Sequence, residues 1–549
     1  MDNDRHRRIA NGRSGHQALL LLLLGAVMAL SVPLAAAGGG LGAVLGVPLE
    51  SARGGLVDGQ PQPDEITGDP RENFLYGSIG AENEAGIPYW VIAVLPRIFK
   101  EYMPGPGGYA AFGLPWEEGK EFPAGFSKKT VIFPRVGFNC ALCHSTQYRT
   151  SAESSPVVVA AGGSNTADIE GLLDFFTKAA NDPRFNAGTI LREVDASYPL
   201  RWYDRLLYRL VIPIVRKRLI QQGKEFAWTA ERPRWGPGRD APMNLTKFNF
   251  LRMPLDKSVD HTDFPSIWHL AAREQPGRTF EEGKTPQPVP AHTMLMNLDG
   301  ATTSFRSVLV DSALGLGARN TPFFRARIPQ LLDWLRELRP PAYPLEIDGG
   351  KAARGASVFE ANCAPCHASG RNNREGTVIP IEEIGTDPER LDTWRHTGAA
   401  AKANAKVASL GIKRTPMIET DGYIAVQLDG IWLRGPYLHN GSVPTMRDLL
   451  APPDRRPKVF CRGYDVIDKE GLGFISDERV DPRCVEGSPP LKPSPWDRRL
   501  PDGRWDEWPR PRVWKYYVSE RGNGNGGHDY GTRLSAAEKD DLIEYLKTL

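Results

Sequence analysis

Two copies of the pattern Cys-x-x-Cys-His stand out among the residues of this chain that could do chemistry. They are Cys140-Ala-Leu-Cys143-His144 and Cys363-Ala-Pro-Cys366-His367. Two thiols three residues apart on one turn can reach the two vinyl groups of a porphyrin, and the next histidine then lies under the iron as its proximal ligand. The pattern therefore predicts two covalently bound haem c groups.

Other chemistry uses similar cysteine patterns. Paired Cys-x-x-Cys motifs can hold zinc, and a single motif can be a thiol redox pair or simply structural. The chain has only 10 histidines in 549 residues, yet one follows each motif directly. That placement favours haem, with zinc binding and thiol chemistry as the alternatives.

The sixth coordination position decides what each haem can do. A His or Met there gives an electron carrier, whereas an open position can bind oxygen or peroxide. Outside residues 1–49 and the two motifs, the candidate ligands are His261, His269, His292, His396, His439, His528, Met103, Met243, Met253, Met294, Met296, Met417 and Met446.

Two histidines are the best candidates for the second haem. His528 lies in a run with four preceding glycines, Gly522-Asn-Gly-Asn-Gly-Gly-His528, and glycine lets the backbone approach a flat macrocycle closely. His439, in Tyr-Leu-His439-Asn-Gly, could ligate iron, bind a haem propionate or brace a turn. We predict His528 as the ligand and keep His439 as the alternative.

The first haem has poorer candidates. The segment that holds His261, His269 and His292 is rich in proline and has no glycine cradle. We therefore expect the distal side of the haem held by His144 to be open and to be the place where chemistry occurs. Phe264 and Trp268 could line that side or be ordinary core residues.

The N-terminus has the pattern of an export segment. Several arginines precede an uninterrupted apolar run from Ala18 to Ala37, which ends in three alanines before Gly38. The run is also long enough to span a bilayer. Residues 1–49 are thus predicted to be a signal peptide or a membrane anchor. The protein is expected to be periplasmic, soluble or anchored to the inner membrane, with membrane contact only through this segment.

The two remaining cysteines agree with export. Cys461 and Cys484 lie outside the haem motifs, and an oxidising compartment would let them pair. We therefore predict a disulfide between them. The 68 basic and 66 acidic residues are spread along the chain, so nothing in the charge pattern argues for nucleic acid.

The elements that must position the motifs are expected to be mostly helices. The chain contains 47 Pro and 56 Gly, which predicts long irregular loops between them. Residues 50–70 resemble a linker, residues 71–339 an N-terminal haem domain and residues 340–549 a C-terminal haem domain. The fold class expected is mainly α, with two cytochrome c-like haem domains.

Helical patterns surround the second motif. Gly355, Phe359 and Cys363 are four residues apart and so share one helical face. The last helix begins with a capping box at Ser535 and Glu538 and carries an apolar stripe. We expect this terminal helix to cross and cover the helix that contains Gly355.

Several segments resemble a known family. They are GFNCALCHS at 137–145, GASVFEANCAPCHASG at 355–370, EIGTDPERL at 383–391, LRGPYLHNGSVPTMRDLL at 433–450 and GGHDYGTRLSAAEKDDLIEYLKTL at 526–549, with weaker likeness at 76–90 and 263–268. The sequence resembles the dihaem cytochrome c peroxidase superfamily, and within it the branch that includes the dihaem rubber oxygenases.

The resemblance implies two helical cytochrome c-like domains with one haem each. It also implies that His367 and His528 ligate the second haem, while His144 alone holds the first. Related sequences tend to have a Trp where this chain has Leu298, so the substrate does not transfer.

Three functions fit these features. The chain could be a peroxidase-like oxidoreductase that passes electrons from the C-terminal haem to an open N-terminal haem, an electron-transfer cytochrome without chemistry of its own, or a haem dioxygenase of the rubber-oxygenase type. Fold cannot choose among them. We expect the first, with a small redox electron donor as partner and hydrogen peroxide or dioxygen as oxidant. The sequence does not identify catalytic side chains.

Overall fold

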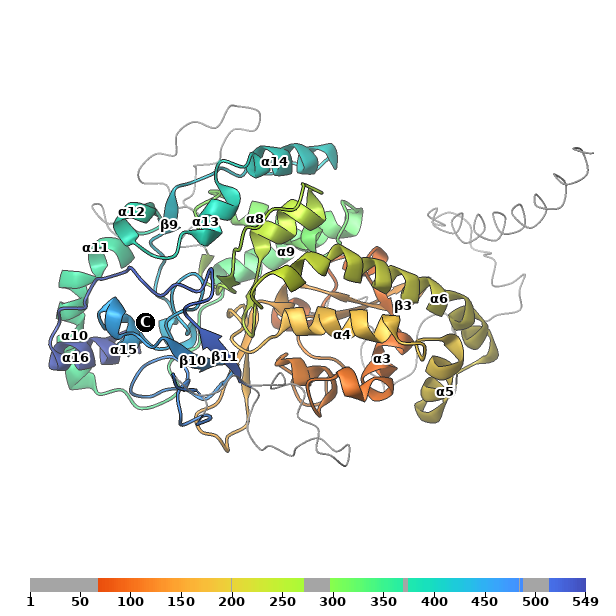
Figure 1. Cartoon of the computed structure of the whole chain (residues 1–549), viewed down its shortest axis with the longest axis horizontal. Helices are drawn as coiled ribbons and strands as arrows, with labels where there is room; N and C mark the ends of the chain where they lie inside the picture. The colour runs from red at the N-terminus through yellow and green to blue at the C-terminus, as the bar shows by residue number, and fades with distance from the viewer. Residues whose placement is uncertain (1–67, 199, 271–296, 369–373, 483, 487–512) are drawn as a thin grey trace, which may run out of the picture. The chain divides into compact units, whose positions relative to one another are not determined.

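The computed structural model describes residues 68–198, 200–270, 297–368, 374–482, 484–486 and 513–549 (Figure 1). The predicted export segment at 1–49, most of the linker at 50–70 and three ligand candidates, His292, Met294 and Met296, lie outside these residues. Helices hold 43% of the described residues and strands 11%. The fold is therefore mixed with helices predominating, and the expectation of a mainly α chain holds only in part.

The N-terminal elements surround the first motif. They are α2 (Pro70–Tyr76), η2 (Ala81–Asn83), β1 (Ile87–Pro88), α3 (Tyr89–Ile98), η3 (Lys100–Tyr102), η4 (Gly108–Phe112), β2 (Phe126–Val131), β3 (Phe133–Phe138), η5 (Cys140–Leu142), β4 (Ser145–Tyr148), β5 (Val157–Ala160), α4 (Ile169–Asn181), α5 (Ala187–Ser197), α6 (Trp202–Glu225), η6 (Ala227–Glu231), β6 (Arg239–Asp240), α7 (Pro242–Asn244), η7 (Leu245–Phe250), β7 (Thr262–Asp263), α8 (Phe305–Gly315) and α9 (Pro322–Glu337).

The C-terminal elements surround the second motif. They are α10 (Gly349–Asn362), α11 (Ala364–His367), β8 (Val378–Pro380), α12 (Ile381–Ile384), α13 (Glu389–Trp394), α14 (Ala399–Ser409), β9 (Gly422–Ile424), η9 (Ile431–Leu433), α15 (Met446–Leu449), η10 (Pro453–Arg455), β10 (Val459–Arg462), β11 (Trp514–Tyr517) and α16 (Ala536–Leu546).

The strands form small antiparallel sheets within the described part of the chain. One has the order β1-β3-β2, and the pairs β4-β5, β6-β7, β8-β9 and β10-β11 make the others. Each strand is two to six residues long. Alternation of apolar and polar residues over so few positions gives no clear pattern, which explains why the sequence predicted mostly helices and loops.

The helix crossing predicted around the second motif is confirmed. Ser535 and Glu538 form both hydrogen bonds of the capping box at the start of α16. A Cβ atom on Gly355 of α10 would lie only 2.0 Å from the carbonyl oxygen of Asp541 in α16. The two helices touch backbone to backbone at this glycine, and Figure 1 shows them side by side.

Three large apolar clusters support the motifs. One lies among α3, α4, α5 and α6, the second includes Cys140 and joins α2 to α8 and α9, and the third packs Phe359 of α10 against Trp432 and α16. Cys363 packs against the third cluster. The two cysteine pairs thus rest on different cores. Within the described ranges, the helices are all too short or too polar to cross a bilayer.

Candidate haem sites

The first motif follows the β2–β3 hairpin. Cys140 opens the short helix η5, whose N-terminus is capped by the Asn139 side chain accepting a hydrogen bond from the amide of Ala141 at 2.9 Å. A Cβ on Gly125, which has φ +94°, would lie 2.3 Å from the Cα atom of Leu142. Only glycine fits there without strain, so the turn carrying both thiols is held by backbone contact.

The second motif ends a longer helix. Cys363 follows the last residue of α10, and residues 364–367 form the single turn α11. Since α10 is fixed by its crossing with α16, the position of Cys363 depends on the terminal helix. None of the four motif cysteines forms a disulfide, so all four thiols are available for attachment.

Both motif histidines are oriented in the same way. The Nδ1 atom of His144 lies 2.8 Å from the carbonyl oxygen of Pro265, and that of His367 lies 2.7 Å from the carbonyl oxygen of Val426. In each ring Nδ1–H donates to the carbonyl, which leaves Nε2 as the nitrogen with a lone pair. Burial lowers the pKa of both imidazoles. Neutral rings anchored through Nδ1 fit proximal haem ligands.

The ring that faces His367 is that of His528. Their centroids are 6.2 Å apart and the ring planes are inclined by 43°. Two histidine nitrogens at about 2 Å from one metal ion would place the ring centroids roughly 6 Å apart. The pair therefore leaves the space that one iron atom between two imidazoles requires.

The loop before α16 holds His528 in an unusual conformation. Its φ is +51°, and its amide donates to the carbonyl of Ile384 at 2.8 Å. Burial, His367 and the Arg456 guanidinium lower the pKa of His528 to about 4. The ring is thus neutral near pH 7, as a metal ligand must be.

Arg456 is a residue that the sequence did not single out. It is buried, and its Nη1 donates to the carbonyl oxygens of Asn525 at 2.6 Å and Gly527 at 2.7 Å. Its Nη2 donates to the carbonyl of His528 at 3.2 Å. A guanidinium can bind several carbonyls in one plane, and here it fixes the glycine-rich loop. A buried arginine that binds only main-chain atoms leaves no sequence signal.

The alternative ligand His439 occupies a different environment. Its ring stacks on Tyr423 with centroids 4.1 Å apart and planes inclined by 16°. Burial and Arg390 lower its pKa to about 3. Its carbonyl oxygen accepts a hydrogen bond from the amide of Asp263 at 2.9 Å. The structure thus brings His528, rather than His439, to the face of His367.

His261 and His269, the described histidine candidates for the first haem, have other partners. His261 contacts the Asn523 side chain through Nδ1 and the Pro233 carbonyl through Nε2, both at 3.1 Å. His269 contacts Asp429 through Nδ1 at 2.8 Å and Arg339 through Nε2. Each of these rings uses both nitrogens within the protein, whereas His144 and His367 use only Nδ1 in the contacts described above.

The other candidates are placed as follows. The exposed side chain of His396 lies near Asp421 at the surface. Met103, Met243 and Met446 are buried in three different apolar clusters, and Met253 and Met417 pack against the cluster that holds Met243.

A single tryptophan connects the segments that orient the two histidines. Trp268 is fully buried and lies three residues beyond Pro265, the partner of His144. Its indole N–H donates to the carbonyl of Asp429 at 3.0 Å, three residues beyond Val426, the partner of His367. Trp268 therefore belongs to the proximal side of the first motif, where it couples the two anchoring segments.

Two acidic groups that influence each other, the half-buried Asp240 and the buried Asp260, lie beside the first motif. Burial and Asp260 raise the pKa of Asp240 to about 8 against the opposing effect of Arg390, and the charge of Asp240 in turn contributes to a raised pKa of the Cys143 thiol. Asp260 accepts hydrogen bonds from the amides of Met243 and Asn244. At neutral pH Asp240 is mostly protonated and can donate a proton. The sequence missed this group because isolated acids in a proline-rich loop form no motif.

Comparison with known proteins bears on the C-terminal part. Residues 422–461, which include Val426 and His439, match a protein-family model described as RoxA-like, cytochrome c-like. The C-terminal part contains a cytochrome c-like domain. This domain supports covalently bound haem c and agrees with the rubber-oxygenase-like branch of the resemblance.

Two curated relatives come from Sinorhizobium fredii (strain NBRC 101917 / NGR234). The uncharacterized protein y4iM is 31% identical over 254 residues, which cover 39% of this chain and 52% of that protein. The uncharacterized protein y4iJ is 28% identical over 278 residues, which cover 39% of this chain and 41% of that protein. The chain thus spans about half or less of the length of these relatives.

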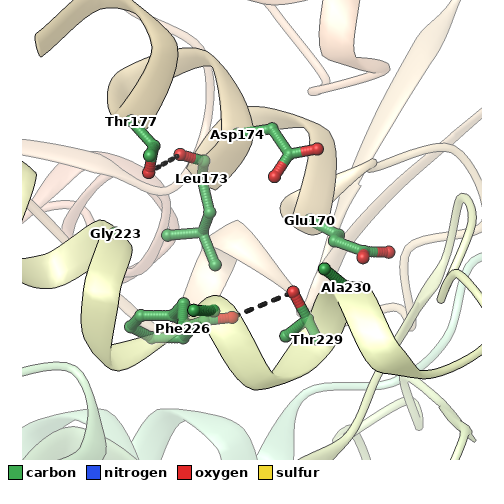
Figure 2. Close-up of a pocket in the computed structure, with 9 residues that line it drawn as sticks. Glu170, Leu173, Asp174, Thr177, Gly223, Phe226, Thr229 and Ala230 are labelled. Atoms are coloured by element: carbon green, nitrogen blue, oxygen red, sulfur yellow. Dashed lines mark hydrogen bonds between the residues drawn. The ribbon is translucent and has the colours of Figure 1, made fainter. Parts of the chain in front are cut away.

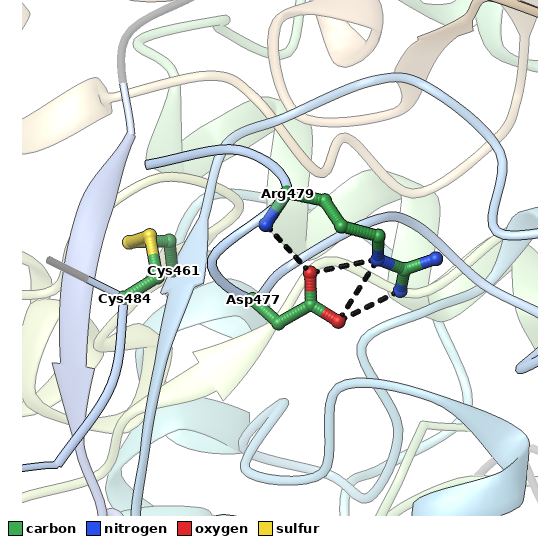
Figure 3. The surroundings of a disulfide bond; sticks show 4 residues. All are labelled: Cys461, Asp477, Arg479 and Cys484. Carbon is green, nitrogen blue, oxygen red and sulfur yellow. Dashed lines mark hydrogen bonds and ion pairs between the residues drawn. A yellow bond between two sulfur atoms is a disulfide. The ribbon is translucent and has the colours of Figure 1, made fainter. Parts of the chain in front are cut away.

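The predicted disulfide is confirmed. Cys461 in β10 is bonded to Cys484, 23 residues further along the chain (Figure 3). Within the enclosed loop, Asp477 accepts hydrogen bonds from the backbone amide and the guanidinium of Arg479. The bond and this local pairing hold a loop without regular secondary structure, directly after the segment matched by the family model.

A surface pocket lies apart from the motif residues. It is lined by α4, the end of α6 and η6, including Glu170, Asp174 and Phe226 (Figure 2). Burial raises the pKa of Glu170 to about 7, although Arg234 opposes this shift. No cysteine or histidine of either motif lines this pocket, so we do not assign it to the haem sites.

Proposed function

We propose that this chain is an exported dihaem c-type cytochrome that acts as a peroxidase-like oxidoreductase. A haem c held by His367 would take electrons from a small redox donor and pass them to a haem c held by His144, whose distal side would be open to hydrogen peroxide or dioxygen. The observation that carries the proposal is the asymmetry of the histidines. The ring centroid of His528 lies 6.2 Å from that of His367, whereas His261 and His269, the described histidine candidates for the first haem, contact other groups.

The chemistry and the protein contributions can be separated. When bound, a haem c supplies one-electron redox chemistry and, where a coordination position is open, a site for a small oxidant. His144 and His367 would hold the two irons through Nε2, and His528 would close the second. Trp268 fills the space between the two anchoring segments and excludes water there.

Asp240 is suited to hold a proton near the first site. Because its pKa is raised to about 8, the carboxyl is mostly protonated at pH 7. General acids work best when their pKa lies near the working pH. We propose that this carboxyl would hold a proton beside the first motif if haem c is bound there.

One observation supports export. The disulfide between Cys461 and Cys484 is typical of an oxidising compartment. The predicted covalent attachment of haem c also agrees with the predicted export segment. We therefore propose a periplasmic location for residues 61–549, either free or tethered by the N-terminal segment.

Carbon monoxide titration of the reduced protein tests the proposal. We expect one CO bound per chain, and none in the double variant Cys140→Ala/Cys143→Ala, which lacks the first haem. The matched variant Cys363→Ala/Cys366→Ala should still bind one. If the variant without the first haem still binds CO, the open site is at the second haem. If the intact protein binds none, the chain is an electron carrier.

The family match favours one alternative. The resemblance to the dihaem rubber oxygenases, with which the RoxA-like match at 422–461 agrees, points to a dioxygenase that cleaves a polymer, which would also need an open first haem. Peroxide reduction consumes electrons from a donor, whereas a dioxygenase inserts both oxygen atoms without a net supply of electrons. Turnover of peroxide with a reduced donor, compared with cleavage of polyisoprene under oxygen, separates the two. The absence of peroxide turnover together with polymer cleavage would replace our proposal with this alternative.

A further inference from the structure

Helix α6 has apolar side chains on two opposite faces. Tyr208, Ile212, Val215 and Leu219 are buried on the inner face, where α6 packs against α4 and α5. The outer face carries Trp202, Leu206, Leu210 and Ile214, whose side chains are 73%, 53%, 66% and 52% exposed. A surface helix of a globular protein normally presents polar residues outward.

The exposed residues form a continuous stripe. They are four residues apart, so they lie one above the other along about 18 Å of the helix. Eight large apolar residues are exposed in the described part of the chain, and four of them belong to this stripe. Single exposed apolar residues need no explanation, but an aligned group indicates a contact surface.

Basic residues border and extend the stripe. Residues 201–225 contain seven Arg and Lys but only two acids, Asp204 and Glu225, whereas the whole chain has a net charge of only +2. Arg209, Lys217, Arg218 and Lys224 are exposed. Both acids lie near an arginine: Glu225 pairs with Arg252, and Arg201 lies close to Asp204.

We propose that α6 lies on an anionic lipid bilayer, with the stripe of Trp202, Leu206, Leu210 and Ile214 inserted at the headgroup boundary. A helix with Trp and Leu on one face and basic residues beside them has the composition of interfacial helices. Tryptophan favours the membrane–water boundary, and Lys and Arg near an anionic surface attract it. This inference does not rest on the haem assignments.

A second copy of the chain is a poorer partner. In a symmetric dimer the same surface meets itself, so the basic border of one α6 would face that of the other. Like charges in contact are unfavourable, and a stripe of four side chains is narrow for a stable interface, which needs about 800 Å² on each partner. An anionic surface instead complements both the charge and the apolar stripe.

Vesicle binding of the full-length exported protein is the first test. The vesicles contain phosphatidylcholine alone or phosphatidylcholine with phosphatidylglycerol. We expect tighter binding to the anionic vesicles and weaker binding in high salt. Leu206→Ser/Leu210→Ser should weaken binding about tenfold or more. Each charge removed in Arg209→Gln/Lys217→Gln/Arg218→Gln should weaken binding about fivefold.

The matched control is Leu255→Ser, which removes an exposed apolar side chain elsewhere and should bind as the parent does. The far-ultraviolet circular dichroism spectrum checks that each variant is folded. If the exported protein lacks the N-terminal segment, equal vesicle binding by the parent protein and by Leu206→Ser/Leu210→Ser would overturn the proposal. A dimer lost in the stripe variant, without vesicle binding, would assign this face to a second copy.

A local probe covers the case in which the N-terminal segment itself inserts. An environment-sensitive fluorophore on Leu210→Cys should shift its emission to the blue when anionic vesicles are added, whereas the same label on Leu255→Cys should not. No shift at residue 210 would overturn the proposal. Blue-shifted emission before vesicles are added would mean that another part of the chain covers the stripe, and would also overturn it.

Discussion

Replacing Gly355 by alanine should separate the two helices that support the second motif. The new Cβ would lie 2.0 Å from the Asp541 carbonyl oxygen, 2.6 Å from its carbonyl carbon and 2.8 Å from the Tyr545 Cβ. Carbon atoms in contact are normally about 3.5 Å or more apart. The helices must therefore move apart by roughly 1.5 Å, and the obstacle is a backbone carbonyl that cannot rotate away.

The expected cost follows from two opposing effects. Overpacking a well-filled interface costs about 1–3 kcal/mol, and the obstacle here places Gly355→Ala at the upper end. Alanine is about 1 kcal/mol more favourable than glycine within a helix. The net destabilisation is therefore about 2 kcal/mol. If α16 opens locally, its amide protection should fall about thirtyfold, since about 1.4 kcal/mol corresponds to a factor of ten.

Hydrogen exchange of α16 in the haem-loaded protein measures this effect. Gly349→Ala is the control, because Gly349 begins the same helix and its Cβ would meet nothing within 4 Å. The control should leave protection unchanged or slightly increased. If Gly355→Ala changes the exchange of α16 less than twofold, the close approach does not limit the packing and the reasoning is wrong.

Three further predictions concern the second haem, the disulfide and a buried carboxyl. His528→Ala should convert the second haem from low spin to high spin in its electron paramagnetic resonance spectrum, whereas His439→Ala should not; the reverse result would make His439 the ligand. Cys461→Ser/Cys484→Ser should lower the free energy of unfolding by about 3 kcal/mol in the chain-entropy description of a closed loop, which a lower urea midpoint would show. In the parent protein, denatured without reduction, a thiol reagent should label neither Cys461 nor Cys484. The folded pKa of Glu170, about 7, lies above the ordinary value of a glutamate, so its contribution to stability is fully present below about pH 4.5 and is lost as the pH rises through 7, by up to roughly 3 kcal/mol. The melting temperature of Glu170→Gln should therefore fall less than that of the parent protein over this pH range. Parallel pH profiles of the two proteins would contradict the raised pKa.

The sequence predicted those features that depend on neighbouring residues. The structure confirms three such features: the capping box at Ser535, the helix face of Gly355 and the disulfide between the two cysteines outside the haem motifs. The first two follow from residue spacing, and the third follows because only these two cysteines lie outside the motifs. The facing of His367 and His528 agrees with the glycine-rich loop, while the ligation itself stays a prediction. Interactions between residues that are close in the sequence can be predicted from residue type and spacing without knowledge of the fold.

The remaining features depend on distant chain segments. His144 finds its carbonyl partner 121 residues away, and Arg456 binds carbonyls about 70 residues away. Every residue, proline and glycine included, has a main-chain carbonyl acceptor, so composition cannot mark these partners. The raised pKa of Asp240 depends likewise on burial and on Asp260, which only the folded chain brings together.

The way in which the two motif histidines are anchored would have a consequence for the redox tuning of any haem that they hold. A carboxylate accepting the Nδ1 proton would make the ring more basic and stabilise oxidised iron, whereas a carbonyl is a neutral acceptor. Both anchors here are main-chain carbonyls, those of Pro265 and Val426. A side-chain substitution at either position leaves the acceptor in place. The basicity of the His144 and His367 rings therefore depends on the backbone conformation at Pro265 and Val426. A point mutation at either acceptor residue that keeps this conformation should leave the basicity unchanged.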